Sequence, residues 1–182
     1  MHPAGVSKIS AARVIPVALI AMAFLACLQP AKSSPLGDQI NCEIQRLFQQ
    51  HSPAVVRVRA SDSMGVRLGS GFFVDAAGTV YTHAGVVLKA EDVTVNFGGR
   101  SLPAKVVASD TRSGIALLKT DCLSPFIPLG NSDAVCVSHP VLAIGFPGER
   151  EVSPTIGLVA GRDFHQNGKQ FSTSHLRMNM PV

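Results

Sequence analysis

The stretch of sequence that decides the fold covers residues 69–82 and is written GSGFFVDAAGTVYT. Two short runs rich in β-branched and aromatic residues, 69–75 and 78–82, flank the turn-forming pair Ala77-Gly78. Strands are enriched in such residues, and a short link that contains glycine is typical of a hairpin. This stretch therefore predicts two antiparallel strands joined by a tight connection.

The same pattern continues on both sides of this hairpin, with turn residues such as Gly98-Gly99 and Pro147-Gly148 between the runs. In chain order, the predicted strands cover residues 55–60, 69–75, 78–82, 92–97, 102–109, 115–120, 140–146, 155–160 and 170–174. The first six strands come at hairpin-like spacing, and six antiparallel strands can close into a small barrel without free edges. We therefore predict an all-β fold with a complete first barrel in residues 54–121.

The second half of the chain predicts less. Residues 122–139 contain Pro125, Pro128 and Gly130 and are interpreted as a connection between two barrels. The three strands expected in residues 140–182 would make about half of a second barrel. Natural sheets normally cover or close such an unpaired edge, so we interpret the end of the chain as an interruption.

The first 33 residues have the layout of a secretory signal peptide: Lys8 and Arg13 precede the apolar run 14–28, and Ala31-Lys32-Ser33 follows it. The run is shorter than the roughly 20 residues that a membrane-spanning helix needs. An alternative fate is lipidation, because residues 23–27 (AFLAC) resemble a loose bacterial lipobox in which Cys27 would carry the lipid. Both interpretations predict an exported protein, periplasmic or extracellular, and the second predicts membrane anchoring.

Residues 34–53 are expected to form an N-terminal segment with a short helix. Asp38 can cap its start, and Pro53 follows its end. The apolar stripe of this helix consists of Ile40, Ile44, Leu47 and Phe48.

Composition excludes some classes of function. The formal net charge is +4, but Lys8, Arg13 and Lys32 belong to the predicted signal peptide and leave a nearly neutral remainder. Basic and aromatic residues do not alternate along any stretch, so we expect no nucleic-acid partner. No C-x-x-C or H-x-x-x-H cluster is present, so we expect neither a metal site nor a cofactor.

Cys122 and Cys136 flank the predicted connection between the barrels. Export permits a disulfide that would close this segment, and two free thiols are the alternative. Spacing alone does not decide between them, because a disulfide also needs a suitable geometry.

Five blocks occur in a characteristic order and spacing: 69–75 (GSGFFVD), 78–82 (GTVYT), 115–119 (IALLK), 128–133 (PLGNSD) and 141–148 (VLAIGFPG). Together they resemble the HtrA/Deg-type branch of the trypsin-like serine proteases, from about residue 52 to residue 174. The resemblance implies two six-stranded barrels with a Ser-His-Asp triad in the cleft between them.

The triad is where this sequence departs from the family. In the family, two residues separate the strand equivalent to 80–82 from the histidine, and Gly85 stands at the histidine's position here. The family's aspartate directly precedes the IALLK block, and Gly114 stands there. The G-x-S-G-G segment expected after residues 170–174 does not occur in the sequence. The chain therefore resembles a degenerate, C-terminally incomplete member.

His83 is the candidate substitute for the missing base. It lies two residues early, which in an extended chain is a displacement of roughly 6–7 Å. A general base must lie within about 3 Å of the proton that it removes, so we predict a polar turn residue instead. Asp110, four residues before Gly114, is expected to cap a turn, and Ser70 is expected to be structural.

These features predict an exported serine endopeptidase homologue without proteolytic activity. One alternative is an exported peptide-binding or scaffold module whose barrel cleft or open sheet edge binds an unfolded or extended peptide. Another alternative is a protein that is active only if a local rearrangement and a downstream segment restore the triad.

Overall fold

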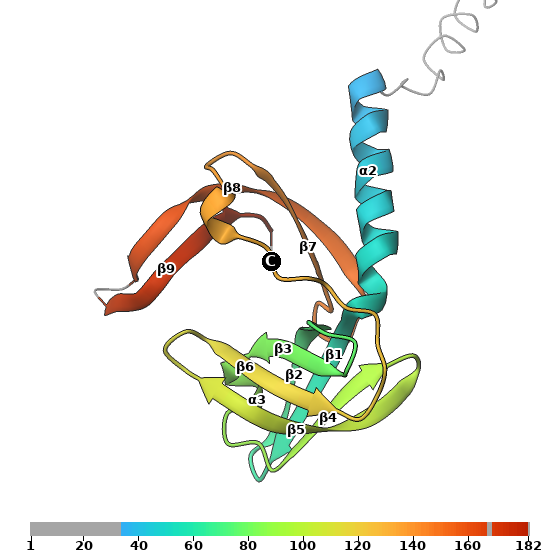
Figure 1. Cartoon of the computed structure of the whole chain (residues 1–182), viewed down its shortest axis with the longest axis vertical. Coiled ribbons are helices and arrows are strands. Elements are labelled where there is room, and N and C mark those ends of the chain that lie inside the picture. The colour runs from blue at the N-terminus through green and yellow to red at the C-terminus, as the bar shows by residue number, and fades with distance from the viewer. Residues whose placement is uncertain (1–33, 167–168, 182) are drawn as a thin grey trace, which may run out of the picture. The chain divides into compact units, whose positions relative to one another are not determined.

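The computed structural model describes residues 34–166 and 169–181, with side chains for residues 34–163 and 175–181. Within this part the chain starts with a helix and continues mainly as strands (Figure 1). The helical elements are α2 (Pro35–His51), η1 (Ser52–Ala54), α3 (Ala84–Val87) and η2 (Ser132–Ala134). The strands are β1 (Val55–Asp62), β2 (Gly65–Phe73), β3 (Thr79–His83), β4 (Asp92–Phe97), β5 (Arg100–Asp110), β6 (Ile115–Thr120), β7 (Pro140–Gly145), β8 (Ser153–Gln166) and β9 (Lys169–Asn179).

Strands β1 to β6 form a closed barrel, which confirms the fold predicted for the first half of the chain. The strands follow the order β1-β2-β3-β6-β5-β4, and pairing between β1 and β4 closes the barrel. All neighbours are antiparallel. Because each strand has two partners, the backbone groups at the edges find hydrogen bonds within the barrel.

The barrel core follows from strand alternation, which points every second side chain inward. In β1 the fully buried side chains are Val56, Val58 and Ala60. Phe73 is fully buried, and its ring meets that of Phe97 edge-to-face with centroids 5.0 Å apart. Such a pair adds to the stabilisation that burial of the rings provides.

The second half of the chain forms a three-stranded sheet in the order β7-β8-β9, the partial second sheet that the sequence predicted. Strands β8 and β9 are longer than predicted. The strand predicted for residues 155–160 continues to Gln166, because the backbone of β8 remains paired with β9 through two register shifts, at Val159/Gly161 and at Asp163/His165. Such bulges allow a ladder to continue past residues of low strand propensity.

Helix α2 begins earlier than predicted. The Gly37 N–H donates to Ser34 Oγ at 3.2 Å, and the Asp38 N–H donates to the Ser34 carbonyl at 3.1 Å. The prediction that Asp38 caps the helix is therefore wrong, because Ser34 provides the first acceptors and Pro35 suits the first helical position. Asp38 lies in the first turn, where a carboxylate interacts favourably with the helix dipole.

The predicted signal peptide, residues 1–33, and the lipidation candidate Cys27 lie outside the described residues. Among the helices that the structure describes, none is both long and apolar enough to cross a membrane.

The connection between β6 and β7 runs along the barrel, where the Ile127 N–H donates to the Phe73 carbonyl at 2.9 Å. Cys122 and Cys136 are both free thiols in the structure. The Cys122 thiol is half-buried and lies 3.2 Å from Thr120 Oγ1, whereas Cys136 is exposed. Of the two alternatives left open by the sequence, the structure contains the free thiols.

Candidate functional site

The segment that follows β3 turns sharply into helix α3. His83 ends the strand with extended backbone angles, and its side-chain Nδ1 accepts the Gly85 N–H at 3.1 Å. The Ala84 N–H donates to the Gly114 carbonyl at 2.8 Å, which joins α3 to the loop before β6. Gly85 therefore lies in the first turn of a short helix and next to this loop.

Gly114 ends a tight loop that begins at Asp110. Its N–H donates to the Asp110 carbonyl at 2.9 Å, and its φ of +75° lies in the left-handed region that favours glycine. The Asp110 carboxylate points back into the loop, because Oδ1 accepts the Arg112 N–H at 3.0 Å. This backbone hydrogen bond lowers the pKa of Asp110, which caps the turn as predicted.

The structure brings Gly85 and Gly114 together on the imidazole ring of His83. A Cβ atom built on Gly85 would lie 3.0 Å from Cε1 and Nδ1 of His83. A Cβ atom built on Gly114 would lie 3.4 Å from Nε2 and 3.6 Å from Cδ2 of the same ring. The His83 ring thus lies beside both glycines that the sequence analysis expected at triad positions.

This placement corrects one assumption of the sequence analysis. The displacement of His83 from the expected base was derived for an extended chain, but the backbone turns into α3 at Ala84. A residue and its second neighbour lie closer together across a helical turn than along a strand. The imidazole consequently approaches the Gly85 position although His83 is two residues early.

The orientation of the ring also follows from its hydrogen bond. Because Nδ1 accepts the Gly85 N–H, the neutral imidazole carries its proton on Nε2. Nε2 is the nitrogen on the Gly114 side of the ring.

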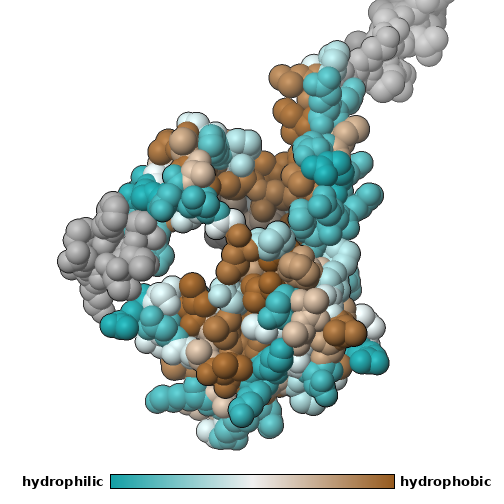
Figure 2. Space-filling view, viewed as in Figure 1, coloured by the Kyte–Doolittle hydropathy of each residue, from teal (hydrophilic) through white to brown (hydrophobic). Residues whose placement is uncertain are grey.

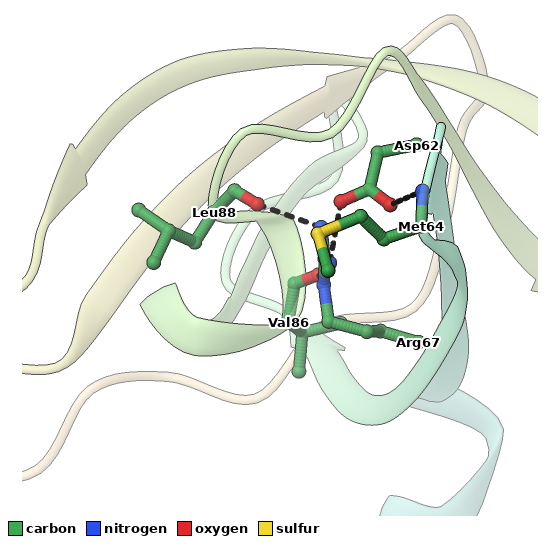
Figure 3. Close-up of polar contacts among 5 residues, drawn as sticks. All are labelled: Asp62, Met64, Arg67, Val86 and Leu88. Carbon is green, nitrogen blue, oxygen red and sulfur yellow. Dashed lines mark hydrogen bonds and ion pairs between the residues drawn. The ribbon is translucent and has the colours of Figure 1, made fainter.

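Helix α3 is held by Arg67 of β2 (Figure 3), a residue that the sequence analysis missed. Its Nε donates to the Val86 carbonyl at 3.0 Å, and Nη2 donates to the Leu88 carbonyl at 2.6 Å. A cation suits the carbonyl-rich end of a helical turn. No local signal reveals this role, because the bonded residues are 19 and 21 positions apart.

Asp62, at the end of β1, orients the guanidinium. Its Oδ2 lies 2.6 Å from Arg67 Nη1, and Oδ1 accepts the Met64 N–H at 2.8 Å (Figure 3). The hydrogen bond from Arg67 is the main reason why the pKa of Asp62 lies below its ordinary value. The β1–β2 hairpin, through Asp62 and Arg67, therefore positions the segment that carries Gly85.

A pocket of about 370 Å³ lies beside this cluster. Apolar groups dominate the lining of this pocket, and His83 contributes an imidazole to it. The lining residues are Ser70, Gly71, Phe72, Tyr81, Thr82, His83, Gly114, Ile115 and Ile144. Since Ile144 belongs to β7, the pocket lies between the barrel and the second sheet.

Ser70 connects the two sides of this pocket. Its Oγ accepts the Phe146 N–H at 2.8 Å, and the Arg57 guanidinium lies 4.9 Å above the centre of the Phe146 ring. These contacts span β1, β2 and the loop after β7 and are consistent with a structural role for Ser70. No group of three His, Cys, Asp or Glu side chains arranged for a metal ion occurs in the described part of the chain.

Known proteins resemble this chain in both sequence and structure. Two relatives carry the name "Probable periplasmic serine endoprotease DegP-like". The one from Pseudomonas fulva is 41% identical over 97 residues, which are 52% of this chain and 20% of the relative. The one from Pseudomonas putida is 40% identical over 116 residues, 63% of this chain and 24% of the relative. The chain thus spans about a quarter or less of the length of these relatives.

Two solved structures share the fold. The HtrA-type protease AlgW with a tripeptide has a TM-score of 0.65 and 29% identity, and the match covers 70% of this chain and 42% of that one. The serine endoprotease from Yersinia pestis has a TM-score of 0.60 and 28% identity, covering 72% and 46%.

The family model of the trypsin-like peptidase domain matches residues 69–179, which include β3, α3 and the Gly114 loop. That match covers more than half of the sequence and agrees with the DegP-like and HtrA-type relatives. The chain therefore belongs to the trypsin-like peptidase family.

Proposed function

We propose that this chain is an exported, HtrA/Deg-like serine endopeptidase homologue that does not hydrolyse peptide bonds. One observation supports the proposal: glycines, Gly85 and Gly114, stand where the family resemblance places the triad histidine and aspartate, and both lie in segments that connect strands of a closed barrel. Both glycines lie well inside the described part of the chain, so residues after Val182 would not replace them.

The chemistry of the family explains the expected loss. A serine hydroxyl becomes an effective nucleophile when a positioned imidazole accepts its proton, and the aspartate holds that imidazole in the correct tautomer. Removal of the histidine alone costs on the order of a millionfold in rate. His83 is a poor replacement, because its Nδ1 accepts the Gly85 N–H and its Nε2 lies on the Gly114 side of the ring.

Proteolysis is tested on the complete product of the gene, with unfolded casein as substrate and a fluorophosphonate as a probe of activated serines. An active DegP-like relative is the positive control. We expect neither casein fragments nor covalent labelling. Cleavage that disappears in a His83→Ala variant would contradict the proposal and favour the alternative in which a local rearrangement restores the triad.

A second candidate function is binding of an extended peptide without cleavage. The apolar pocket between the barrel and β7 favours it, since Phe72, Ile115 and Ile144 offer a surface for an apolar side chain. Ile115 is 47% exposed, so a charge there should disturb the pocket more than the barrel core.

Isothermal titration with permanently unfolded casein tests this binding function. Ile115→Asp should abolish heat release upon binding. Val107→Asp is the matched control, because Val107 is 62% exposed on the adjacent strand β5 and does not line the pocket. Absence of binding by the unmodified chain, or equal binding by both variants, would eliminate the cleft as a peptide site.

Export is proposed from the signal-like residues 1–33 and agrees with the periplasmic names of the relatives. Cell fractionation and N-terminal sequencing of the mature protein test it. A mature chain that starts near Ser34 supports signal cleavage, a lipid-modified Cys27 supports anchoring, and an uncleaved protein in the cytoplasm contradicts both.

A further inference from the structure

The imidazole of His83 lies in the space that side chains at positions 85 and 114 would share. The nearest atoms to the Cβ positions of both glycines belong to this ring, and no other atoms lie within 4 Å apart from chain neighbours and, for Gly85, the backbone of its own helix. The contact at Gly85 would be 3.0 Å, which is closer than carbon atoms approach without repulsion. The exposed ring of His83 is therefore the side chain nearest to both glycines.

His83 also occupies the backbone hydrogen-bonding group of this region. Its Nδ1 accepts the Gly85 N–H, so the ring caps α3 as serine or asparagine caps other helices. If the ring rotated away, this N–H would lose its acceptor. The observed His83 rotamer is therefore stabilised by α3, the helix in which a catalytic histidine at position 85 would have to lie.

An aspartate at position 114 would meet His83 first. Its Cβ would lie 3.4 Å from Nε2, so a carboxylate attached to this Cβ can reach the ring. Nε2 carries the proton of the neutral imidazole, so it is a donor that such a carboxylate would accept. A histidine at position 85 would then compete with His83 for both space and hydrogen-bonding partner.

We infer that His83, in addition to the two glycines, keeps a His–Asp pair from forming at this site. Its imidazole prevents a histidine at position 85 and an aspartate at position 114 from forming a hydrogen-bonded pair. The inference rests on the proposed function for the assignment of these two positions. Substitution of the two glycines alone does not restore a His–Asp pair, whereas simultaneous replacement of His83 by a smaller capping residue does.

The experiment compares Gly85→His/Gly114→Asp with the triple variant that also carries His83→Ser. Serine retains a side-chain acceptor for the cap but lacks the ring. Proton NMR detects a hydrogen-bonded imidazole N–H as a low-field resonance. We expect this resonance from the introduced histidine in the triple variant and not in the double variant, with assignment by selective ¹⁵N-histidine labelling.

Thermal melting provides a second readout, in case the double variant is poorly folded. The triple variant should melt at least about 2 °C above the double variant, because residues that compete for one site show coupling. His83→Ser alone is the reference, and Gly114→Asn in place of Gly114→Asp carries the same backbone strain without the charge.

The inference is overturned if the low-field resonance of the histidine introduced at position 85 appears equally with and without His83, or if His83→Ser lowers the melting temperature by the same amount in both backgrounds. A resonance in Gly114→Asp alone, which has no histidine at position 85, identifies the signal of His83 itself. Neither result depends on proteolysis. Casein cleavage by the unmodified chain would instead overturn the proposed function, so the two failures are distinguishable.

Discussion

The barrel and the three-stranded sheet both contain hydrophobic strand residues, but they bury these side chains to different extents. In the barrel, Phe73, Leu118, Val56, Val58, Val80 and Val95 are completely buried. In the sheet, Val159 is the buried hydrophobic residue among the described side chains, and Ile156 and Leu158 are each 48% exposed. Figure 2 shows apolar side chains at the surface of the molecule in this view.

Closure explains the difference. Every barrel strand has two neighbours, and the inward side chains face one another across the closed interior. Strands β7 and β9 each have one neighbour within the sheet, so one edge of each remains without a partner strand among the described elements. Hydrophobic strand residues therefore contribute fully to stability where the sheet closes around them, and only in part where it stays open.

The largest predicted effect comes from the barrel core. Leu118→Ala should lower the free energy of unfolding by about 2–5 kcal/mol, because Leu118 is fully buried and its removal leaves a cavity. Urea denaturation followed by circular dichroism measures the change. A loss below about 1 kcal/mol would show that the barrel does not dominate stability.

The contact between β2 and α3 should give the next largest effect. A Cβ on Gly69 would overlap a methyl group of Val86, so Gly69→Ala should cost about 1–3 kcal/mol through overpacking. Gly130→Ala is the matched control, because nothing lies within 4 Å of its Cβ position. Combination with Val86→Ala should relieve most of the Gly69→Ala cost, and equal costs in both backgrounds would refute the contact.

The Asp62–Arg67 pair should give a smaller, pH-dependent effect. The pKa of Asp62 is lowered in the folded state, so its contribution is present above the unfolded value of about 3.9 and is lost as the pH falls through the folded value. The urea midpoint of Asp62→Asn should therefore lie below that of the unmodified chain at pH 7 and approach it at pH 3. A difference that stays constant across this range would exclude the ion pair as its cause.

The smallest effect is predicted for Leu158→Ala in β8. The side chain is 48% exposed, so the free energy of unfolding should change by about 0.5 kcal/mol or less. The same substitution at Leu118 is its direct counterpart in the barrel. A loss as large as that of Leu118→Ala would mean that Leu158 is covered in solution by a partner or by another part of the protein.

Much of the barrel could be predicted from the sequence, because strand alternation and turn residues are local signals. The runs around Phe73 and Leu118 were recognised as strands, and their order allowed closure to be expected. The sheet was predicted less well. The continuation of β8 beyond Ala160 depends on pairing with β9 and has no apolar alternation of its own.

At the candidate site, the sequence by itself determined that positions 85 and 114 are glycines, and the family resemblance predicts a histidine and an aspartate there. The tertiary structure decided which side chain lies beside these two positions. His83 reaches both positions because the chain turns at Ala84 and because Arg67, 19 residues before Val86, holds that turn against β2. The identity of each residue is given directly by the sequence. Which distant residues approach one another depends on how the strands pair and close, and no local sequence pattern contains that information.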